Sequence, residues 1–119
     1  MKYRNGRLGE EIRKLVSEML LHDLKDPRLQ GMVSVSAVEV TRDLSYATIY
    51  IMVLGEKLTD EATPERKAEV LAAFDSAKRL IRREVAQEIQ LRRAPELIFK
   101  IDESMEYARH MDAVLDSLK

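Results

Sequence analysis

The chain has 119 residues and no cysteine, with 34% charged residues, 45% hydrophobic residues and a formal net charge of −1. This length and balance suit a single domain, residues 1–119, that can bury a core without disulfide or metal staples. The absence of cysteine excludes disulfides, thiol catalysis and thiolate metal sites. No apolar run approaches the roughly 20 residues that cross a bilayer, and no signal peptide is evident, so we expect a cytoplasmic protein.

The small net charge conceals an uneven distribution of charge along the chain. Residues 1–14 hold five bases and two acids, whereas residues 102–119 hold five acids and two bases. The two ends should therefore face different surroundings. The acidic C-terminal end could contact another protein or form a solvated face, and we favour the solvated face.

Apolar residues at helical spacing predict a first helix from about Leu8 to Leu24, which Pro27 ends. Two stretches of alternating apolar residues follow, residues 33–40 and 46–53, joined by a short polar connection. They predict an antiparallel hairpin. The apolar phase of the first stretch shifts after Ala37, which predicts a β-bulge.

Thr63 is a plausible N-cap for a second helical pattern, with Pro64 at its first position. The pattern runs to about Gln90, longer than most globular helices, so we expect a bend in it. A third strand at residues 96–101 and a closing helix at residues 105–119 complete the chain. The order α-β-β-α-β-α predicts an α+β fold, a three-stranded sheet with helices on one side.

A basic run lies on the second helical pattern, away from its apolar stripe. Residues 78–93 hold six bases and two acids, a local charge of +4. Like charges four residues apart disfavour an isolated helix by about 0.2–0.5 kcal/mol per pair, whereas a phosphate backbone would make them favourable. The six bases are Lys78, Arg79, Arg82, Arg83, Arg92 and Arg93. An equally weighted alternative is a solvated helix face on which Asp75 pairs with Lys78 or Arg79.

Other candidate sites are weaker. Tyr46 and Tyr50 share one face of a strand and could stack on bases, although packing is the favoured interpretation. Glu84 and Glu88 are best explained as ion-pair partners of nearby bases. The chain lacks metal-ligand spacing, a phosphate-binding glycine loop and a nucleophile elbow, so we expect no enzyme activity, metal or cofactor.

Six segments of the chain, in this order and spacing, match a known pattern: EIRKLVSEML (11–20), KDPRL (25–29), VSVSAVEVTRDLSYA (33–47), IRRE (81–84), RRAPELIF (92–99) and DESMEY (102–107). Over nearly its whole length the sequence resembles the ribosome-binding factor A family, which are bacterial factors for small-subunit maturation. The resemblance implies a single KH-like domain of type II, in which the two helices after the hairpin meet at a kink.

The family resemblance places that kink at Ser76, Ala77, Lys78 and Arg79. The family has an Ala-x-Gly sequence there, but in this chain Arg79 stands at the glycine position. Arginine lacks the freedom of glycine at positive φ and is a good helix former. Either Ser76 and Ala77 carry the kink with mostly helical angles, or the helix continues through it. We hypothesise that the charge of Arg79 partly replaces a close approach of the backbone to RNA.

The resemblance also implies a function. Members bind the free small (30S) ribosomal subunit and its 16S ribosomal RNA near the 5′ terminal helix, and they assist late maturation, rRNA processing and cold adaptation without catalysis. The implied partners are that RNA and neighbouring ribosomal proteins, with no membrane or small-molecule substrate, and we expect a monomer. The expected RNA-contacting residues are Arg4, Arg7, Lys78, Arg79, Arg82, Arg83, Arg92 and Arg93. The alternative is a protein-interaction module whose basic helix binds an acidic partner.

Overall fold

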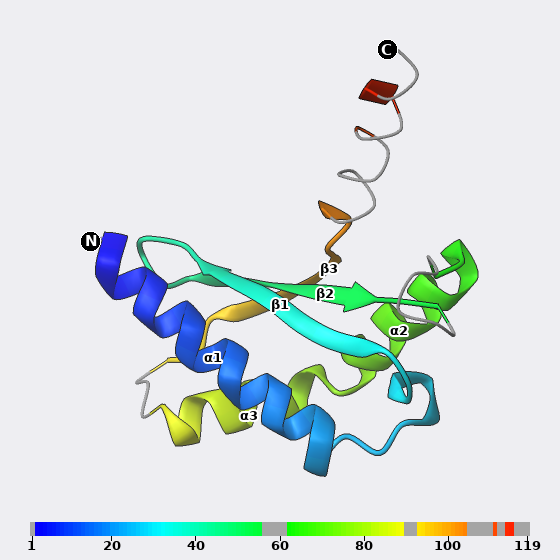
Figure 1. Ribbon diagram of the computed structural model, residues 1–119. Helices are drawn as coiled ribbons and strands as arrows, with labels where there is room; N and C mark the ends of the chain where they lie inside the picture. The colour runs from blue at the N-terminus through cyan, green and yellow to red at the C-terminus, as the bar shows by residue number, and fades with distance from the viewer. Residues whose placement is uncertain (1, 56–61, 90–92, 105–110, 112–113, 116–119) are drawn as a thin grey trace.

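The computed structural model describes residues 2–55, 62–89, 93–104, 111 and 114–115 (Figure 1). The closing helix predicted for residues 105–119 lies outside the described residues, apart from Met111, Val114 and Leu115. The described elements are α1 (Lys2–His22), a 3₁₀ helix η1 (Pro27–Leu29), β1 (Val33–Val40), β2 (Tyr46–Val53), α2 (Pro64–Ser76), α3 (Lys78–Glu88) and β3 (Glu96–Ile101).

Helix α1 buries one face against the sheet. Ile12, Val16 and Met19 are fully or almost fully buried along this face. The helix begins six residues before the predicted start at Leu8, because residues 2–7 extend it without adding to the apolar stripe that the prediction followed. It ends at His22, and Met19 O then accepts from the backbone N–H groups of Asp23 and Leu24, both at 2.8 Å.

Strands β1 and β2 form the predicted antiparallel hairpin, in which Val33 pairs with Val53. The register shifts between Val35 and Ala37, so the predicted bulge is confirmed, with Ser36 as the extra residue. Strand β3 pairs in parallel with β2 and gives the sheet order β1-β2-β3. The sequence did not predict this parallel pairing.

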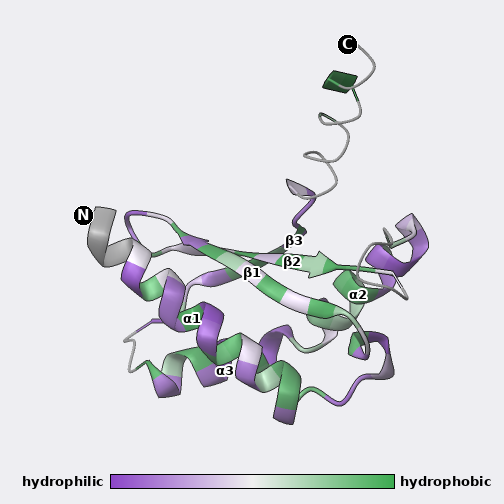
Figure 2. Ribbon diagram, viewed as in Figure 1, coloured by the Kyte–Doolittle hydropathy of each residue, from purple (hydrophilic) through white to green (hydrophobic). Residues whose placement is uncertain are grey.

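Helices α1, α2 and α3 cover the same face of the sheet (Figure 1). The side chains of β2 that face them are Ala47, Ile49, Ile51 and Val53, and each is buried. Alternate residues of β2 face the other, open side, and Figure 2 shows the resulting mixture of apolar and polar residues along the strands. The aromatic rings of Phe74 and Phe99 stack with their centroids 5.2 Å apart and join α2 to β3 within the core.

Residues 64–88 form two helices rather than one. Thr63 caps the first, because its hydroxyl accepts from Arg66 N at 3.1 Å, as predicted. Ala77 alone separates α2 from α3, with φ −90° and ψ 0°, and its N–H points to Ala73 O and Phe74 O, each at 3.1 Å. The interruption therefore uses right-handed angles and needs no glycine, and Arg79 lies within α3 in helical conformation. Helices α2 and α3 leave it in different directions (Figure 1).

Candidate nucleic-acid interface

Helix α3 carries its bases in two rows. At about 100° per residue, Lys78 and Arg82 lie beside the buried stripe, whereas Arg79 and Arg83 lie on the far side of the helix. The buried stripe of α3 is Ile81 and Val85. The two rows therefore have different surroundings.

The first row is tied to the sheet through Glu96, the first residue of β3. Lys78 Nζ lies 3.1 Å from Glu96 Oε1, and Arg82 Nη1 lies 3.6 Å from Glu96 Oε2. Arg82 Nη2 also donates to Ala94 O at 3.3 Å. Both basic side chains remain partly exposed, at 35% and 44%. Glu96 thus offsets part of the positive charge that the local sequence contains.

The second row is open to solvent. Arg79 and Arg83 are exposed, and neither makes an ion pair or side-chain hydrogen bond with a residue that the structure describes. In the solvated-face alternative, the pairing of Asp75 with Lys78 or Arg79 is wrong, since Lys78 pairs with Glu96 and Arg79 with no described residue, whereas the exposure of this row agrees with a solvated face. Glu84 and Glu88 also form no ion pair within the described part of the chain, so their predicted pairing is wrong as well. These two arginines keep their full donor capacity for an anion.

Arg28 is a further base at the α2–α3 interruption, and sequence reasoning missed it. Its Nη2 lies 2.6 Å from Asp26 Oδ2 and 3.5 Å from Ser76 Oγ, beside Ala77. Asp26 caps η1 by accepting from Arg28 N at 2.9 Å, and the side-chain hydrogen bonds of Arg28 hold the pKa of this carboxyl below its usual range. The segment KDPRL carries this arginine, but 48 residues separate it from Ser76, so no local pattern could connect the two.

Hydrogen bonds from Arg66 hold η1 against α2. Arg66 Nη1 donates to Arg28 O and Arg66 Nη2 donates to Gln30 O, both at 2.6 Å. The Arg66 guanidinium is therefore used in hydrogen bonds within the fold. The Arg28 side chain, in contrast, is 39% exposed and can still meet a ligand. The fold therefore adds one base to the neighbourhood of Arg79.

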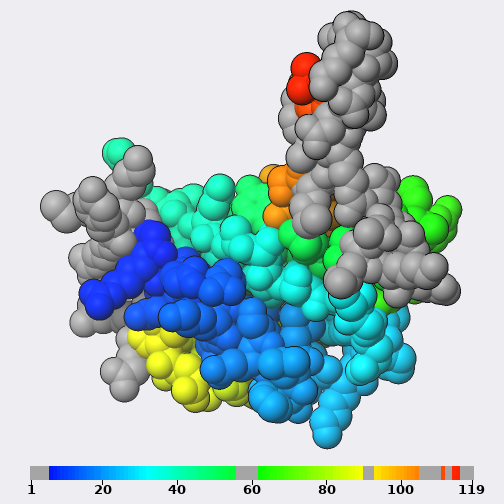
Figure 3. Space-filling view, in the orientation of Figure 1, coloured from blue at the N-terminus to red at the C-terminus, as the bar shows by residue number. Residues whose placement is uncertain are grey.

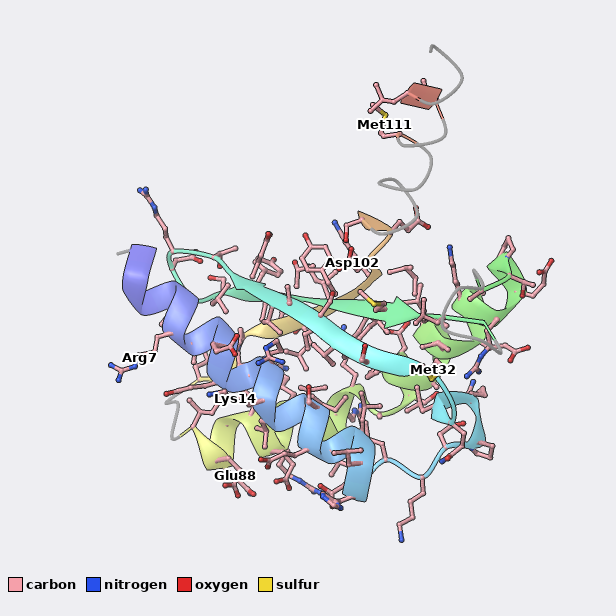
Figure 4. The ribbon with its side chains drawn as sticks, in the orientation of Figure 1. Arg7, Lys14, Met32, Glu88, Asp102 and Met111 are labelled. Atoms are coloured by element: carbon pink, nitrogen blue, oxygen red, sulfur yellow. The ribbon has the colours of Figure 1, made fainter. Side chains whose placement is uncertain are left out.

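The remaining predicted bases lie away from the interruption or outside the described part. Arg7 is exposed on α1 and points away from the molecule at the end where the β1–β2 turn lies (Figure 4). From the side shown in Figure 3, α1 lies in front of α3. Arg93 is exposed just before β3. The side chain of Arg4, at the start of α1, and the whole of Arg92 lie outside the described residues.

The described residues contain neither a membrane-spanning helix nor a cluster of metal ligands. No helix there is both long and apolar enough to cross a bilayer. Histidine and acidic side chains of those residues do not gather in threes at the spacing of metal ligands. The feature that stands out is therefore the basic surface of α3.

Comparison with known proteins gives consistent matches. The family model for ribosome-binding factor A matches residues 4–115. The ribosome-binding factor A of Clostridium tetani is 43% identical over 118 residues, covering 99% of this chain and 92% of that protein.

Solved structures agree on the fold. The solution NMR structure of a Thermotoga maritima protein matches with a TM-score of 0.70 and 37% identity. The match covers 84% of this chain and 88% of the Thermotoga chain. A Thermus thermophilus ribosome binding factor A, fitted as a homology model into a cryo-EM map of a 30S complex, has a TM-score of 0.60 and 23% identity. The match covers 83% of this chain and 96% of the Thermus chain. This last likeness supports the shared fold alone.

Proposed function

Since this chain belongs to the ribosome-binding factor A family, we propose that it binds the free small ribosomal subunit and acts there as an assembly factor without catalysis. The observation that carries the proposal is the pair of unpaired arginines, Arg79 and Arg83, on the solvent side of α3 directly after the helix interruption. Arg28 and the partly neutralised Lys78 and Arg82 enlarge the same surface. We define these five residues as the α3 basic surface.

Such a surface suits a phosphate backbone. Arginine donates in a planar fork that matches two oxygens of one phosphate. Contacts of this kind fix position and orientation without reading sequence. Selectivity then comes from the shape of the RNA and from the ribosomal proteins beside it. This division of roles matches a factor that recognises one place on a large particle.

The finer features of the proposal concern the particle and the stage of its assembly. The RNA is the 16S ribosomal RNA of the small subunit near its 5′ terminal helix, and the step assisted is late maturation with rRNA processing, in keeping with a part in cold adaptation. The chain acts as a monomer and as one RNA-binding domain. A ribosomal partner implies a cytoplasmic location.

The test compares arginines on α3 with a base elsewhere. Arg79→Gln and Arg83→Gln are made singly and together, with Lys100→Gln as the control, because Lys100 is exposed on the open face of the sheet. Each contact to single-stranded or irregular RNA contributes about 0.7 to the slope of log affinity against log salt, so the double variant should flatten the slope by about 1.4. Lys100→Gln should leave the slope almost unchanged.

The same variants separate RNA binding from protein binding. If the double variant binds naked 16S RNA as well as the parent does, phosphate contact by α3 is ruled out. If the double variant keeps its binding to naked RNA but loses binding to an acidic ribosomal protein, the basic helix binds a protein partner instead of RNA. Arg79→Gly gives a further check, because RNA affinity equal to that of the parent would contradict a role for the charge of Arg79.

A further inference from the structure

A second feature of the fold lies at the end of the sheet, apart from the helix interruption. The turn between β1 and β2, the start of β3 and Arg82 of α3 enclose an open cavity of about 680 Å³. Its lining residues are Asp43, Leu44, Ser45, Tyr46, Arg82, Arg93, Ala94 and Glu96. Small-molecule sites in proteins commonly have about 300–1,000 Å³, which leaves room here for one nucleotide.

The turn that forms one wall of the cavity is held by several hydrogen bonds. The Asp43 carboxylate accepts from Thr41 Oγ1 at 2.8 Å and from Ser45 N at 3.1 Å. Leu44 takes φ +62°, a value that non-glycine residues seldom adopt, and its N–H donates to Thr41 O. Ser45 O accepts from Glu96 N at 2.8 Å and so attaches the turn to β3. The wall is therefore set before any ligand arrives.

Some charged side chains of the cavity already form ion pairs or hydrogen bonds within the described part of the protein, and one does not. The Glu96 carboxylate is shared by Lys78 and Arg82, and the Asp43 carboxylate is engaged by the turn. The Arg93 side chain makes no hydrogen bond or ion pair with the residues that the structure describes. Arg93 thus supplies an unneutralised donor in the lining of the cavity, and Glu96, in the same lining, keeps acceptor capacity.

The two tyrosines of β2, which look equivalent in the sequence, differ in the structure. Tyr50 is half-buried, and its hydroxyl lies 3.4 Å from Glu39 Oε2 on β1. Tyr46 is 49% exposed and lines the cavity. Its backbone is fixed by the turn, since Tyr46 N donates to Thr41 Oγ1 at 3.1 Å and Tyr46 O accepts from Thr41 N at 3.0 Å. Tyr46 therefore has a fixed backbone and an exposed aromatic ring, and it lines the same cavity as Arg93, which is unpaired among the described residues.

We propose that this cavity receives one unpaired RNA nucleotide, whose base stacks on Tyr46 and whose phosphate contacts Arg93. Single-stranded RNA is bound in this way by many proteins, through an aromatic face for the base and a cation for the backbone. Glu96 accepts hydrogen bonds, so bases with an exocyclic amino group, such as cytosine, are preferred over uracil. The proposal deepens the proposed function, because it gives the RNA-binding chain a second contact beyond the α3 basic surface.

The test is an NMR titration of the full ¹⁵N-labelled chain at fixed ionic strength. The probes are cytidine 5′-monophosphate, uridine 5′-monophosphate and inorganic phosphate. The cytidine nucleotide should shift the amides of residues 43–46 and 93–97, more strongly than the uridine nucleotide at equal concentration, and phosphate should shift them least. Tyr46→Leu should weaken cytidine binding by roughly fivefold to a hundredfold, the range of stacking on one aromatic side chain. Tyr46→Phe and the matched Tyr50→Phe should each stay within about twofold of the parent.

Several results would overturn the proposal. One is the absence of shifts at those amides; another is equal shifts with inorganic phosphate, which would mean an anion site without base recognition. Unchanged affinity of Tyr46→Leu would do the same. The spectra themselves report whether each variant is folded, and Arg93→Gln serves as a second variant if Tyr46→Leu is not. Binding of the parent chain to isolated small subunits is measured alongside, so loss of the proposed function is seen separately from loss of the nucleotide site.

Discussion

At the scale of single residues, Gly9 lies where α1 approaches the backbone of β1 closely. A Cβ atom at this position would lie 2.5 Å from Val38 O of β1, which is a backbone atom and cannot rotate away. Gly6 lies on the same helix, and a Cβ there would meet nothing within 4 Å. The same substitution at these two positions should therefore have opposite effects.

Gly9→Ala should lower the free energy of unfolding by about 1–2 kcal/mol, because overpacking of about 1–3 kcal/mol outweighs a gain in helix propensity of up to about 1 kcal/mol. Gly6→Ala should raise it by up to about 1 kcal/mol, since only the propensity gain applies. Urea unfolding followed by circular dichroism measures both. Stabilisation of both variants would show that α1 does not approach β1 this closely.

Loss of the negative charge of Glu96 should improve RNA binding, and a glutamine at this position keeps a side-chain oxygen that can accept a hydrogen bond from a base. Glu96 holds Lys78 and Arg82 at 3.1 Å and 3.6 Å, so Glu96→Gln releases two bases toward a phosphate backbone. RNA affinity at low salt should rise by roughly two- to fivefold, and the salt slope should steepen by about 0.7, one further phosphate. Filter binding across a salt series gives both numbers.

The control for Glu96 is Glu103→Gln, which removes the same charge beyond the end of β3. Glu103 lies 3.6 Å from Lys67 of α2, away from α3. RNA affinity should change much less in this variant than in Glu96→Gln. An equal gain in the two variants would mean that only net charge matters and that the Glu96 contacts do not restrain the bases.

At the scale of elements, the bulge of β1 is joined to the segment after β3. Ser36 Oγ donates to Asp102 Oδ2 at 2.6 Å, and Asp102 Oδ1 accepts from Ser104 N at 2.9 Å (Figure 4). Asp102 N also donates to Ile51 O of β2 at 2.7 Å. The hydrogen bonds from Ser36 and then Ser104 hold the pKa of Asp102 below its usual range. Asp102, directly after β3, thus contacts β1 through its carboxylate and β2 through its backbone N–H.

This network predicts a pH dependence. A carboxyl with a lowered pKa in the folded state stabilises the protein above its unfolded pKa, about 3.9, and the contribution is lost as the pH falls through the folded value. Ser36→Ala should lower the free energy of unfolding by about 0.5–1 kcal/mol at pH 7, with allowance for solvent at a half-buried site. At an acidic pH below the folded pKa of Asp102, the variant and the parent should be almost equal.

Ser34→Ala is the matched control on the same strand, because Ser34 is exposed. It should behave like the parent at both pH values. A Ser36→Ala loss that is as large in acid as at neutral pH would show that the serine acts by packing or through Tyr50 O, which lies 3.3 Å from its hydroxyl, and not through the Asp102 carboxylate.

The sequence predicted elements well where the signal is local. The hairpin, the bulge and the Thr63 cap each depend on residues within a few positions, and all three are present. The start of α1 was missed because residues 2–7 add no apolar period. The parallel pairing of β3 with β2 was missed because it joins residues that are 50 positions apart in the sequence, such as Tyr46 and Glu96. Pairing over such distances depends on the packing of the helices between them.

In the candidate site, too, the sequence predicted what depends on neighbouring residues and missed what depends on distant ones. The sequence identified Lys78, Arg79, Arg82 and Arg83 from their spacing, but it could not separate the two rows. Glu96, which makes the difference, lies 18 and 14 residues further on in a strand. Arg28 and the Tyr46 cavity also depend on contacts between distant segments. Local charge therefore marks the right helix, and tertiary structure decides which of its bases are free.

At the scale of the whole molecule, exposed bases are spread along α3, from the helix interruption toward the end of the molecule where the β1–β2 turn lies (Figure 1). Arg79 and Arg83 project from α3, Arg28 lies at the interruption, and Arg7 and Arg93 lie toward the β1–β2 turn. The open face of the sheet is mixed in character (Figure 2). We expect the side that carries these bases to face ribosomal RNA and the open face to remain free or to meet protein.

Co-sedimentation of the full chain with isolated small subunits, large subunits and whole ribosomes over a salt series tests the central claim most directly. Retention on the small subunit alone is the predicted result. With about five phosphates neutralised on irregular RNA, log affinity should fall with log salt at a slope near −3.5. Retention with a slope near zero, or equal retention on the large subunit, would contradict binding through the α3 basic surface.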